Sequence, residues 1–284
     1  MAVLNCLVNG ELTKSLSVND RGFNYGQGVF ETIAVVNKKL IFWAEHYKRL
    51  VLGCNVLAIT VPVESELKKD ITRLIDESCN QDAFVIKIII TRGDGERGYK
   101  DPVKKNTNIV LILSNYPNYN KKNWCDGISV KLCKTKLSRQ SQLAGIKHLN
   151  RLEQVLARQE WDDEFQEGLM FDELGNLIEG VMSNAFIIEN ETVITPFIEN
   201  SGVKGVMRQI VMELCESSGI TYKEDDVSLE RLLSADELFL TNSLIGIWPV
   251  KNVENKVYQV GKITKKITSD LFKEYLVDYA TFSF

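Results

Sequence analysis

The order of the strands and helices that the hydrophobic pattern predicts is the feature that most restricts the fold of this chain. The first half is predicted to hold strands near 4–8 and 29–36, helices at 44–58 and 64–79, and strands at 84–91 and 108–114. Helices and strands therefore come in groups and do not alternate one by one. This grouping favours an α+β architecture and argues against a doubly wound parallel sheet.

A polar, apolar-poor stretch around residues 114–123 is the best candidate for a linker between domains. We therefore expect a smaller N-terminal α+β domain at 1–115, a linker at 116–123 and a larger C-terminal domain at 124–284. The elements predicted for the second half are a strand at 128–133, a helix at 149–161, a hairpin turn at 172–176, a helix at 206–217, a strand at 237–241 and a helix at 262–276.

Composition excludes several classes of protein. The chain has 284 residues, 44% apolar and 25% charged, with a net charge of −4 and no long basic block, so nucleic-acid binding has no electrostatic support. Its apolar runs are too short to span a bilayer, and no basic segment precedes an apolar one at the N-terminus, so we expect a cytoplasmic protein without a membrane partner. Two histidines leave little material for a metal site, and the six cysteines, which form no C-x-x-C pair, are expected to be buried free thiols.

Lys147 is the first of four residues or segments that could carry chemistry. It follows Gly145 and Ile146 and precedes a segment with helical apolar spacing. A lysine in apolar surroundings loses hydration, so its pKa falls and its amine can form a Schiff base with an aldehyde. A solvated surface lysine is the commoner explanation for any single lysine.

The other three features are also weak when each is taken alone. Glu179 lies among apolar residues, where it is either a solvated charge at a strand edge or a buried carboxylate that needs a cationic partner. Gly205 precedes a predicted helix whose first N–H groups could bind phosphate, although an ordinary helix start is the commoner case. Arg49 follows Glu45 by four residues, so it could form an ion pair within a helix or bind phosphate oxygens.

The order and spacing of these features resemble those of the fold-type IV pyridoxal-phosphate enzymes, the group of the D-amino-acid and branched-chain aminotransferases. Residues 20–31, DRGFNYGQGVFE, are similar to the D-R-G…Y-G-D-G-V-F-E opening of that group, with Gln27 in place of the usual Asp. Residues 44–50, AEHYKRL, resemble its H-x-x-R-L segment, and residues 205–208, GVMR, resemble its phosphate-binding turn. The interval of 32 residues from Lys147 to Glu179 is similar to that of the D-amino-acid branch.

Three further segments resemble the aminodeoxychorismate lyases within this group. These are TRGDGERGY at 91–99, LAGIKHLNRLEQ at 143–154 and LTNSLIGIWPV at 240–250. The D-amino-acid aminotransferases bind the substrate carboxylate with an Arg-x-His pair, where this chain has Arg97 and Tyr99. The resemblance thus favours a lyase over an aminotransferase.

This resemblance implies a two-domain fold-type IV enzyme, with the site between the domains, that forms a homodimer and binds pyridoxal 5′-phosphate. The implied reaction converts 4-amino-4-deoxychorismate to p-aminobenzoate and pyruvate in folate synthesis. The alternatives are a D-amino-acid or branched-chain aminotransferase on the same fold, or an inactive binding member without the absorption band of the bound cofactor. The implied site comprises Lys147 as the cofactor-bearing and catalytic residue, Glu179 at the pyridine nitrogen, Arg49, Val206, Met207 and Ser243 at the phosphate, and Arg97, Tyr99, Thr32 and Asn242 at the substrate.

Overall fold

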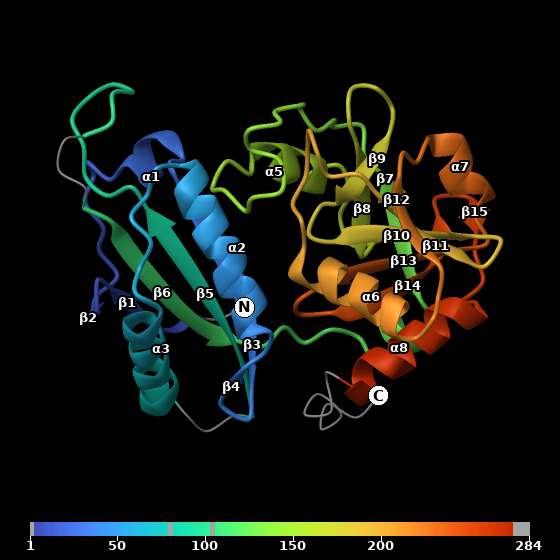
Figure 1. Cartoon of the computed structure of the whole chain (residues 1–284), viewed down its shortest axis with the longest axis horizontal. Helices are drawn as coiled ribbons and strands as arrows, with labels where there is room; N and C mark the ends of the chain where they lie inside the picture. Colours follow the sequence, from blue (N-terminus) through green and yellow to red (C-terminus); the bar gives the residue numbers. More distant parts are fainter. Residues whose placement is uncertain (1–2, 79–81, 103–105, 275–284) are drawn as a thin grey trace. The chain divides into compact units, whose positions relative to one another are not determined.

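The chain folds into two compact units, shown with their helices and strands in Figure 1. This computed structural model describes residues 3–78, 82–102 and 106–274. One unit comprises Met1–Asn118 together with Ile146–Asn150, and the other comprises Tyr119–Gly145 together with Arg151–Phe284. The second half of the chain therefore returns five residues, Lys147 among them, to the first unit.

The first unit is built on a six-stranded antiparallel sheet in the order β2-β1-β6-β5-β3-β4. Its elements are β1 (Val3–Val8), β2 (Glu11–Leu12), α1 (Arg21–Tyr25), β3 (Gly28–Val36), β4 (Lys39–Leu40), α2 (Trp43–Val56), α3 (Glu64–Ser78), β5 (Ala83–Thr91) and β6 (Asn108–Asn115). All six elements predicted for this half are confirmed to within two residues; Cys79, the last residue of the predicted helix 64–79, lies outside the described residues.

The core of the first unit lies between the sheet and its two long helices. Successive residues of a strand point to opposite faces, so Ile33 and Val35 of β3 and Ile86 and Ile88 of β5 share one buried face with side chains of α2 and α3. The other face of β3 and β5 carries Phe30, Thr32 and Lys87, which are all less buried. This second face is the one that matters for the site.

Residues 146–150 join the first unit through backbone hydrogen bonds to β3. The N–H of Phe30 donates to the carbonyl of Lys147 at 2.9 Å, and the N–H of Leu149 donates to the carbonyl of Gly28 at 2.9 Å. A residue paired with a strand cannot be helical, so Leu149 is excluded from the helix, and α5 spans only Leu152–Arg158; the predicted helix 149–161 was too long at both ends. The same contacts group Lys147 with the first unit, whereas the sequence placed it in the larger C-terminal domain.

The second unit is built on a nine-stranded mixed sheet in the order β12-β11-β10-β13-β14-β7-β8-β9, with β15 paired to β14. Its elements are α4 (Lys122–Cys125), β7 (Ile128–Leu132), α5, β8 (Glu167–Phe171), β9 (Leu177–Gly180), β10 (Asn184–Glu189), β11 (Thr192–Pro196), α6 (Val206–Ser217), β12 (Tyr222–Asp225), α7 (Leu229–Ser234), β13 (Glu237–Asn242), β14 (Gly246–Val253), β15 (Lys256–Val257) and α8 (Lys262–Glu274).

The predictions for the second half are confirmed apart from the helix that was too long; residues 275 and 276, the end of the predicted helix 262–276, lie outside the described residues. The turn predicted at 172–176 connects β8 to β9, and α6 has the predicted bounds. The N-terminal turn of α6 follows a connection that contacts β9 and β10, as described below. The sheet therefore positions Glu179, on β9, close to the start of α6.

The cysteines are free thiols within the described residues, but they are not all buried. Cys6, Cys54, Cys133 and Cys215 are buried, whereas Cys125 at the end of α4 is exposed, so the prediction of burial is wrong for that residue. Cys79 lies outside the described residues. None of the described helices is long and apolar enough to cross a membrane.

Candidate active site

Lys147 lies in an extended segment where an aromatic ring contacts its ammonium group. Its Nζ is 4.5 Å from the centroid of the Phe30 ring, a distance at which the ring face attracts a cation. The preceding residue, Ile146, is buried and lies next to Gly53 of α2, where an added Cβ would come within 3.7 Å of it. Lys147 itself is half-buried. The segment thus holds a lysine against apolar groups without enclosing it.

A buried group of three side chains lies on the helix-covered face of the same sheet. Glu31 of β3 accepts hydrogen bonds from Arg49 of α2, with Nε at 2.8 Å and Nη2 at 2.5 Å. The same carboxylate lies 2.7 Å from Nδ1 of His46, one turn earlier on α2. The predicted alternative for Arg49 was an ion pair with Glu45, but the structure gives it Glu31. Two of its three guanidinium nitrogens are fixed by this contact.

The pKa values of this group follow from burial and from the charges within it. Burial alone would raise the pKa of Glu31, but the charge and hydrogen bonds of Arg49, with the hydrogen bond of His46, outweigh it and lower that pKa to about 2. Burial lowers the pKa of His46, and the charges of Arg49 and Lys147 add to the effect against the opposing influence of Glu31. His46 is therefore neutral at pH 7, and Glu31 and Arg49 are a charged pair.

Lys87 is a candidate site residue that the sequence did not single out. It lies on β5 directly opposite Thr32 of β3, and its Nζ is 5.0 Å from the centroid of the Phe30 ring. Phe30 therefore contacts two lysines, Lys87 and Lys147, and burial lowers the pKa of Lys87. A charged residue within the apolar run 84–90 was the signal that could have revealed it.

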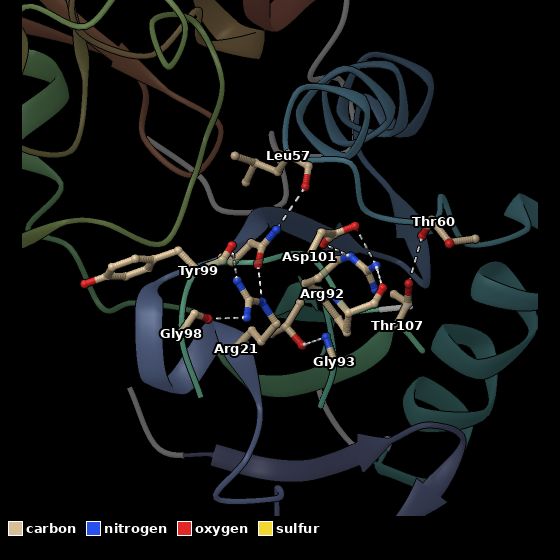
Figure 2. A network of polar contacts seen from close by, with 12 residues as sticks. Arg21, Leu57, Thr60, Arg92, Gly93, Gly98, Tyr99, Asp101 and Thr107 are labelled. Atoms are coloured by element: carbon tan, nitrogen blue, oxygen red, sulfur yellow. Dashed lines mark hydrogen bonds and ion pairs between the residues drawn. The ribbon is translucent and has the colours of Figure 1, made fainter. Parts of the chain in front are cut away.

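Arg97 and Tyr99 lie on the loop that follows β5, and both are exposed. The side chain of Tyr99 has a relative accessibility of 88%, and its ring lies 5.4 Å from that of Tyr25. A network of polar contacts around Arg21 and Arg92 adjoins the loop, as Figure 2 shows. The sequence predicted these two residues to bind the substrate, and the structure places both where a ligand from outside this unit could reach them.

In the second unit, Glu179 is a buried carboxylate on β9. Its side chain accepts a hydrogen bond from the N–H of Val203 at 2.8 Å, and an added Cβ on Gly202 would lie 3.2 Å from the same oxygen. Gly202 also has a φ of +83°, which a side chain would strain. Burial lowers the pKa of Arg151, and the charge of Glu179 partly offsets that change, so a cation lies in the neighbourhood of this carboxylate.

The start of α6 combines the first N–H groups of a helix with a closely packed glycine. Val206 and Met207 are its first two residues, so their N–H groups have no partner within the helix, and the N-cap residue, Gly205, has no side chain to cap them. Asn184 of β10 donates to the carbonyl of Val203 at 2.9 Å, and its Oδ1 would lie 2.0 Å from a Cβ added to Gly205. Asn184, which the sequence did not reveal, therefore fixes the backbone that leads into the helix.

Ser243 and Asn242 lie at the end of β13. Asn242 accepts from the N–H groups of Leu244 and Ile245 and donates to the carbonyl of Met182, so both ends of its carboxamide are used by the fold. The turn that it stabilises presents Ser243, which is half-buried. Because Thr241 on β13 is paired with Asn184, this turn and the start of α6 lie at the same end of the sheet.

Each unit, taken by itself, holds a distinct set of groups. The first unit has a lysine in an apolar setting and an oriented guanidinium, and the second has a buried carboxylate near the start of a helix. These are the groups that a reactive aldehyde, a cationic ring and a phosphate require. A family model described as Amino-transferase class IV matches residues 28–253, which include all of them.

The chain belongs to the class IV aminotransferase family.

Relatives and solved structures that match nearly the whole length of this chain support its membership. The aminodeoxychorismate lyase of Vibrio harveyi is 34% identical over 269 residues, which are 93% of this chain and 98% of that one. The crystal structure of 4-amino-4-deoxychorismate lyase from Pseudomonas aeruginosa is 40% identical, covers 95% of this chain and 98% of its own, and has a TM-score of 0.89.

A third likeness shows the fold alone. An aminotransferase from Brucella abortus, whose crystal structure is bound to the cofactor PLP, is 19% identical and has a TM-score of 0.80 over 97% of this chain and 100% of its own. The fold-type IV architecture and the α+β class predicted from the sequence are thereby confirmed.

Proposed function

We propose that this enzyme converts 4-amino-4-deoxychorismate to p-aminobenzoate and pyruvate with the help of pyridoxal 5′-phosphate. The observation that carries the proposal is the similarity to two lyases named for this substrate, at 34% and 40% identity over more than nine-tenths of each chain. The family match over residues 28–253 includes every residue that we assign to the site. The sequence segments at 91–99 and 143–154 support the same reaction.

The residues present fit pyridoxal phosphate. When bound, this cofactor supplies an aldehyde that reacts with amines and a ring that accepts electron density. Lys147 is the amine for the aldehyde, and Glu179, buried and already held by one N–H donor, is the anion for a protonated ring nitrogen. The uncapped start of α6 supplies N–H donors for the phosphate.

The phosphate contacts are assigned to groups that the fold already orients. The N–H groups of Val206 and Met207 begin α6, and the hydroxyl of Ser243 lies at the same end of the sheet. Arg49 adds positive charge, and Glu31 fixes the plane of its guanidinium in advance, which reduces the entropy lost on binding. In this proposal Asn242 holds the turn that presents Ser243.

Proton transfer is assigned to Nζ of Lys147. This amine removes the proton from the substrate carbon that bears the nitrogen, and it delivers a proton to the pyruvyl group as that group leaves. The Phe30 ring, whose centroid lies 4.5 Å from Nζ, holds this amine in place. Thr32, on the same face of β3 as Phe30, lines the site on that side.

The substrate carries two carboxylates, so the site needs cations besides those that hold the phosphate. Lys87 lies beside Phe30 and opposite Thr32, so it is a candidate cation on that face. Arg97 can form paired hydrogen bonds to a carboxylate, and Tyr99 next to it can add another. A homodimer in which these exposed residues serve the partner's site, and a cytoplasmic location, stay predictions.

An assay of products tests the proposed reaction. The purified holoenzyme is incubated with 4-amino-4-deoxychorismate, and p-aminobenzoate and pyruvate are measured. A parallel incubation contains D-alanine or a branched-chain amino acid with 2-oxoglutarate. We expect rapid formation of p-aminobenzoate and slow amino transfer. Rapid amino transfer without p-aminobenzoate would assign the chain to the aminotransferases and would leave the cofactor site unchanged.

A further inference from the structure

The buried side chain of Arg21 lies directly beneath the loop formed by residues 93–100, which carries Arg97 and Tyr99. Arg21 has a relative accessibility of 4%. Its Nη1 donates to the carbonyl of Gly98 at 2.9 Å and its Nη2 to the carbonyl of Tyr99 at 3.4 Å, as Figure 2 shows. Its own N–H donates to the carbonyl of Gly93 at 2.9 Å. One residue therefore holds both ends of the 93–100 loop.

Gln27 fixes the guanidinium of Arg21 in this position. Its Oε1 accepts from Nε of Arg21 at 2.6 Å, while its Nε2 donates to the carbonyl of Leu57 at 3.3 Å. Leu57 is the residue immediately after α2, the helix that carries His46 and Arg49. The amide of Gln27 thus links the loop, through Arg21, to the helix that we assign to the cofactor phosphate.

The chemistry of this position explains why it holds an amide. Position 27 lies between a guanidinium, which donates, and a backbone carbonyl, which accepts, and only a group with both functions satisfies the two. The aspartate usual in the resembled motif is shorter by one methylene and has no donor when ionised. Gln27 is a neutral partner, and the other hydrogen bonds that the Arg21 guanidinium makes among the described residues go to backbone carbonyls, so it forms no ion pair there.

Additional contacts hold the loop against Arg21. The N–H of Gly98 donates to the hydroxyl of Tyr25 at 3.0 Å, and the guanidinium of Arg21 lies 4.9 Å from the Tyr25 ring. Gly95 allows close approach, because a Cβ there would lie 2.8 Å from Cδ of Arg21. Arg92 is fully buried, and its Nε and Nη2 donate to the carboxylate of Asp101 at 2.9 and 3.0 Å. These hydrogen bonds hold the chain just after the loop. The backbone of the loop is therefore ordered, although the side chains of Arg97 and Tyr99 are exposed.

We propose that Gln27 and Arg21 are positioning residues that hold the 93–100 loop in its substrate-binding conformation and so determine the affinity for the anionic substrate. This inference rests on the proposed function, because it takes Arg97 and Tyr99 as substrate contacts. Arg21 acts in two ways. It fixes the backbone of the two residues, Arg97 and Tyr99. Its positive charge also makes the electrostatic potential near their side chains favourable for a carboxylate.

The first test replaces Gln27 by Leu in the holoenzyme and measures two quantities. Hydrogen exchange of peptides that cover 93–100 reports, without any substrate, how firmly Gln27 and Arg21 hold the loop. We expect the exchange rate of these peptides to increase clearly. A lost hydrogen bond to a charged group corresponds to about tenfold in an equilibrium constant, so we expect KM for 4-amino-4-deoxychorismate to rise about tenfold with kcat changed less than about twofold. The absorption spectrum of the bound cofactor should not change.

Two other variants make the test specific. Gln27→Glu keeps an oxygen for Nε of Arg21 but loses the donor to Leu57 and neutralises the charge, so we expect it to retain more exchange protection than Gln27→Leu and still to raise KM. Thr107→Val is the matched control. It removes another hydrogen bond between a side chain and a backbone carbonyl near the end of α2, Thr107 to Thr60, without touching Arg21. It should leave exchange of 93–100 and KM as in the unaltered enzyme.

The outcomes separate this inference from the proposed function. An unchanged exchange rate in Gln27→Leu, or the same increase in Thr107→Val, would contradict the inference that Gln27 and Arg21 hold the loop. Accelerated exchange with an unchanged KM would overturn its role in substrate binding. If the unaltered enzyme makes no p-aminobenzoate, the proposed function fails, and hydrogen exchange still decides whether Gln27 and Arg21 hold the loop.

Discussion

Replacement of Glu31 by Gln should destabilise the first unit strongly, although it changes a single atom from oxygen to nitrogen. Glu31 is buried and joins Arg49 through two hydrogen bonds, with His46 at its other side. The amide keeps the shape of the side chain but removes its negative charge. The guanidinium of Arg49 is then left in a largely buried position without the anion that balances it.

The size of the effect follows from the pKa of Glu31. The folded protein lowers this pKa from 4.5 to about 2. Because one pKa unit is equivalent to about 1.4 kcal/mol, the ionised carboxylate contributes ~3 kcal/mol to the free energy of unfolding at pH 7. Breaking a buried ion pair by removing one partner typically costs about 3–5 kcal/mol, which agrees with this value.

The same shift fixes the dependence on pH. A carboxyl group whose pKa is lower in the folded state stabilises that state above its unfolded pKa, and the contribution is lost as the pH falls toward the folded value. For Glu31 the loss begins near pH 4.5 and continues to about pH 2. The difference between the unaltered protein and Glu31→Gln should therefore fall from ~3 kcal/mol at pH 7 to ~2 kcal/mol at pH 3.5.

Urea unfolding of the cofactor-free protein, followed by circular dichroism at several pH values, measures this difference without interference from phosphate binding. Glu77→Gln is the control, because Glu77 pairs with Arg73 on the exposed side of α3 and a pair of that kind contributes little. A difference below about 1 kcal/mol at pH 7, or one that grows as the pH falls, would refute the assignment of Glu31 as the buried anion that holds Arg49.

The remaining predictions concern the cofactor. Lys147→Ala should abolish turnover and the covalent link; borohydride reduction and peptide mapping check this, and label on another lysine, such as Lys204, would contradict it. Glu179→Gln should fold and bind cofactor but lose most activity, since each unit of lost pKa preference at the ring nitrogen is worth ~1.4 kcal/mol; turnover close to that of the unaltered enzyme would exclude the role. Gly205→Ala, whose Cβ would lie 2.0 Å from Oδ1 of Asn184, should displace the start of α6 and weaken pyridoxal phosphate binding about tenfold in a titration of the cofactor-free protein.

The sequence predicted those parts of the fold that depend on local periodicity. The apolar spacing of α2, α3 and α6 gave their bounds to within about two residues, because each helix buries one continuous face. It failed at residues 149–151, where the apolar spacing continues but the helix has not begun. The hydrogen bonds that hold 147–149 come from β3, more than a hundred residues earlier, and no local pattern contains them.

Residues of the candidate site were predictable where a motif fixed them, and not where a partner distant in sequence defines their role. Lys147, Glu179 and Arg49 came from spacing and resemblance. For Arg49, however, the alternative to phosphate binding was an ion pair with Glu45 four residues away on the same helix, whereas its hydrogen-bonded carboxylate is Glu31 on a strand. Lys87 was missed because β5 carries apolar residues on both of its faces, so the sequence shows no polar face there. Its significance appears only in the structure, where β3 places Phe30 and Thr32 beside it.

Gln27 shows most clearly why some residues become intelligible only in three dimensions. In the sequence it is a departure from a motif, and a departure alone gives no indication of function. In the structure it lies between a guanidinium and a carbonyl that are 6 and 30 residues away along the chain, and its amide is the group that satisfies both. An aspartate there would satisfy Arg21 through its charge and leave the end of α2 unlinked. The amide does not neutralise Arg21, but it hydrogen-bonds both to Arg21 and to the carbonyl of Leu57. The same side chain therefore connects the loop that carries Arg97 to the end of the helix that carries Arg49.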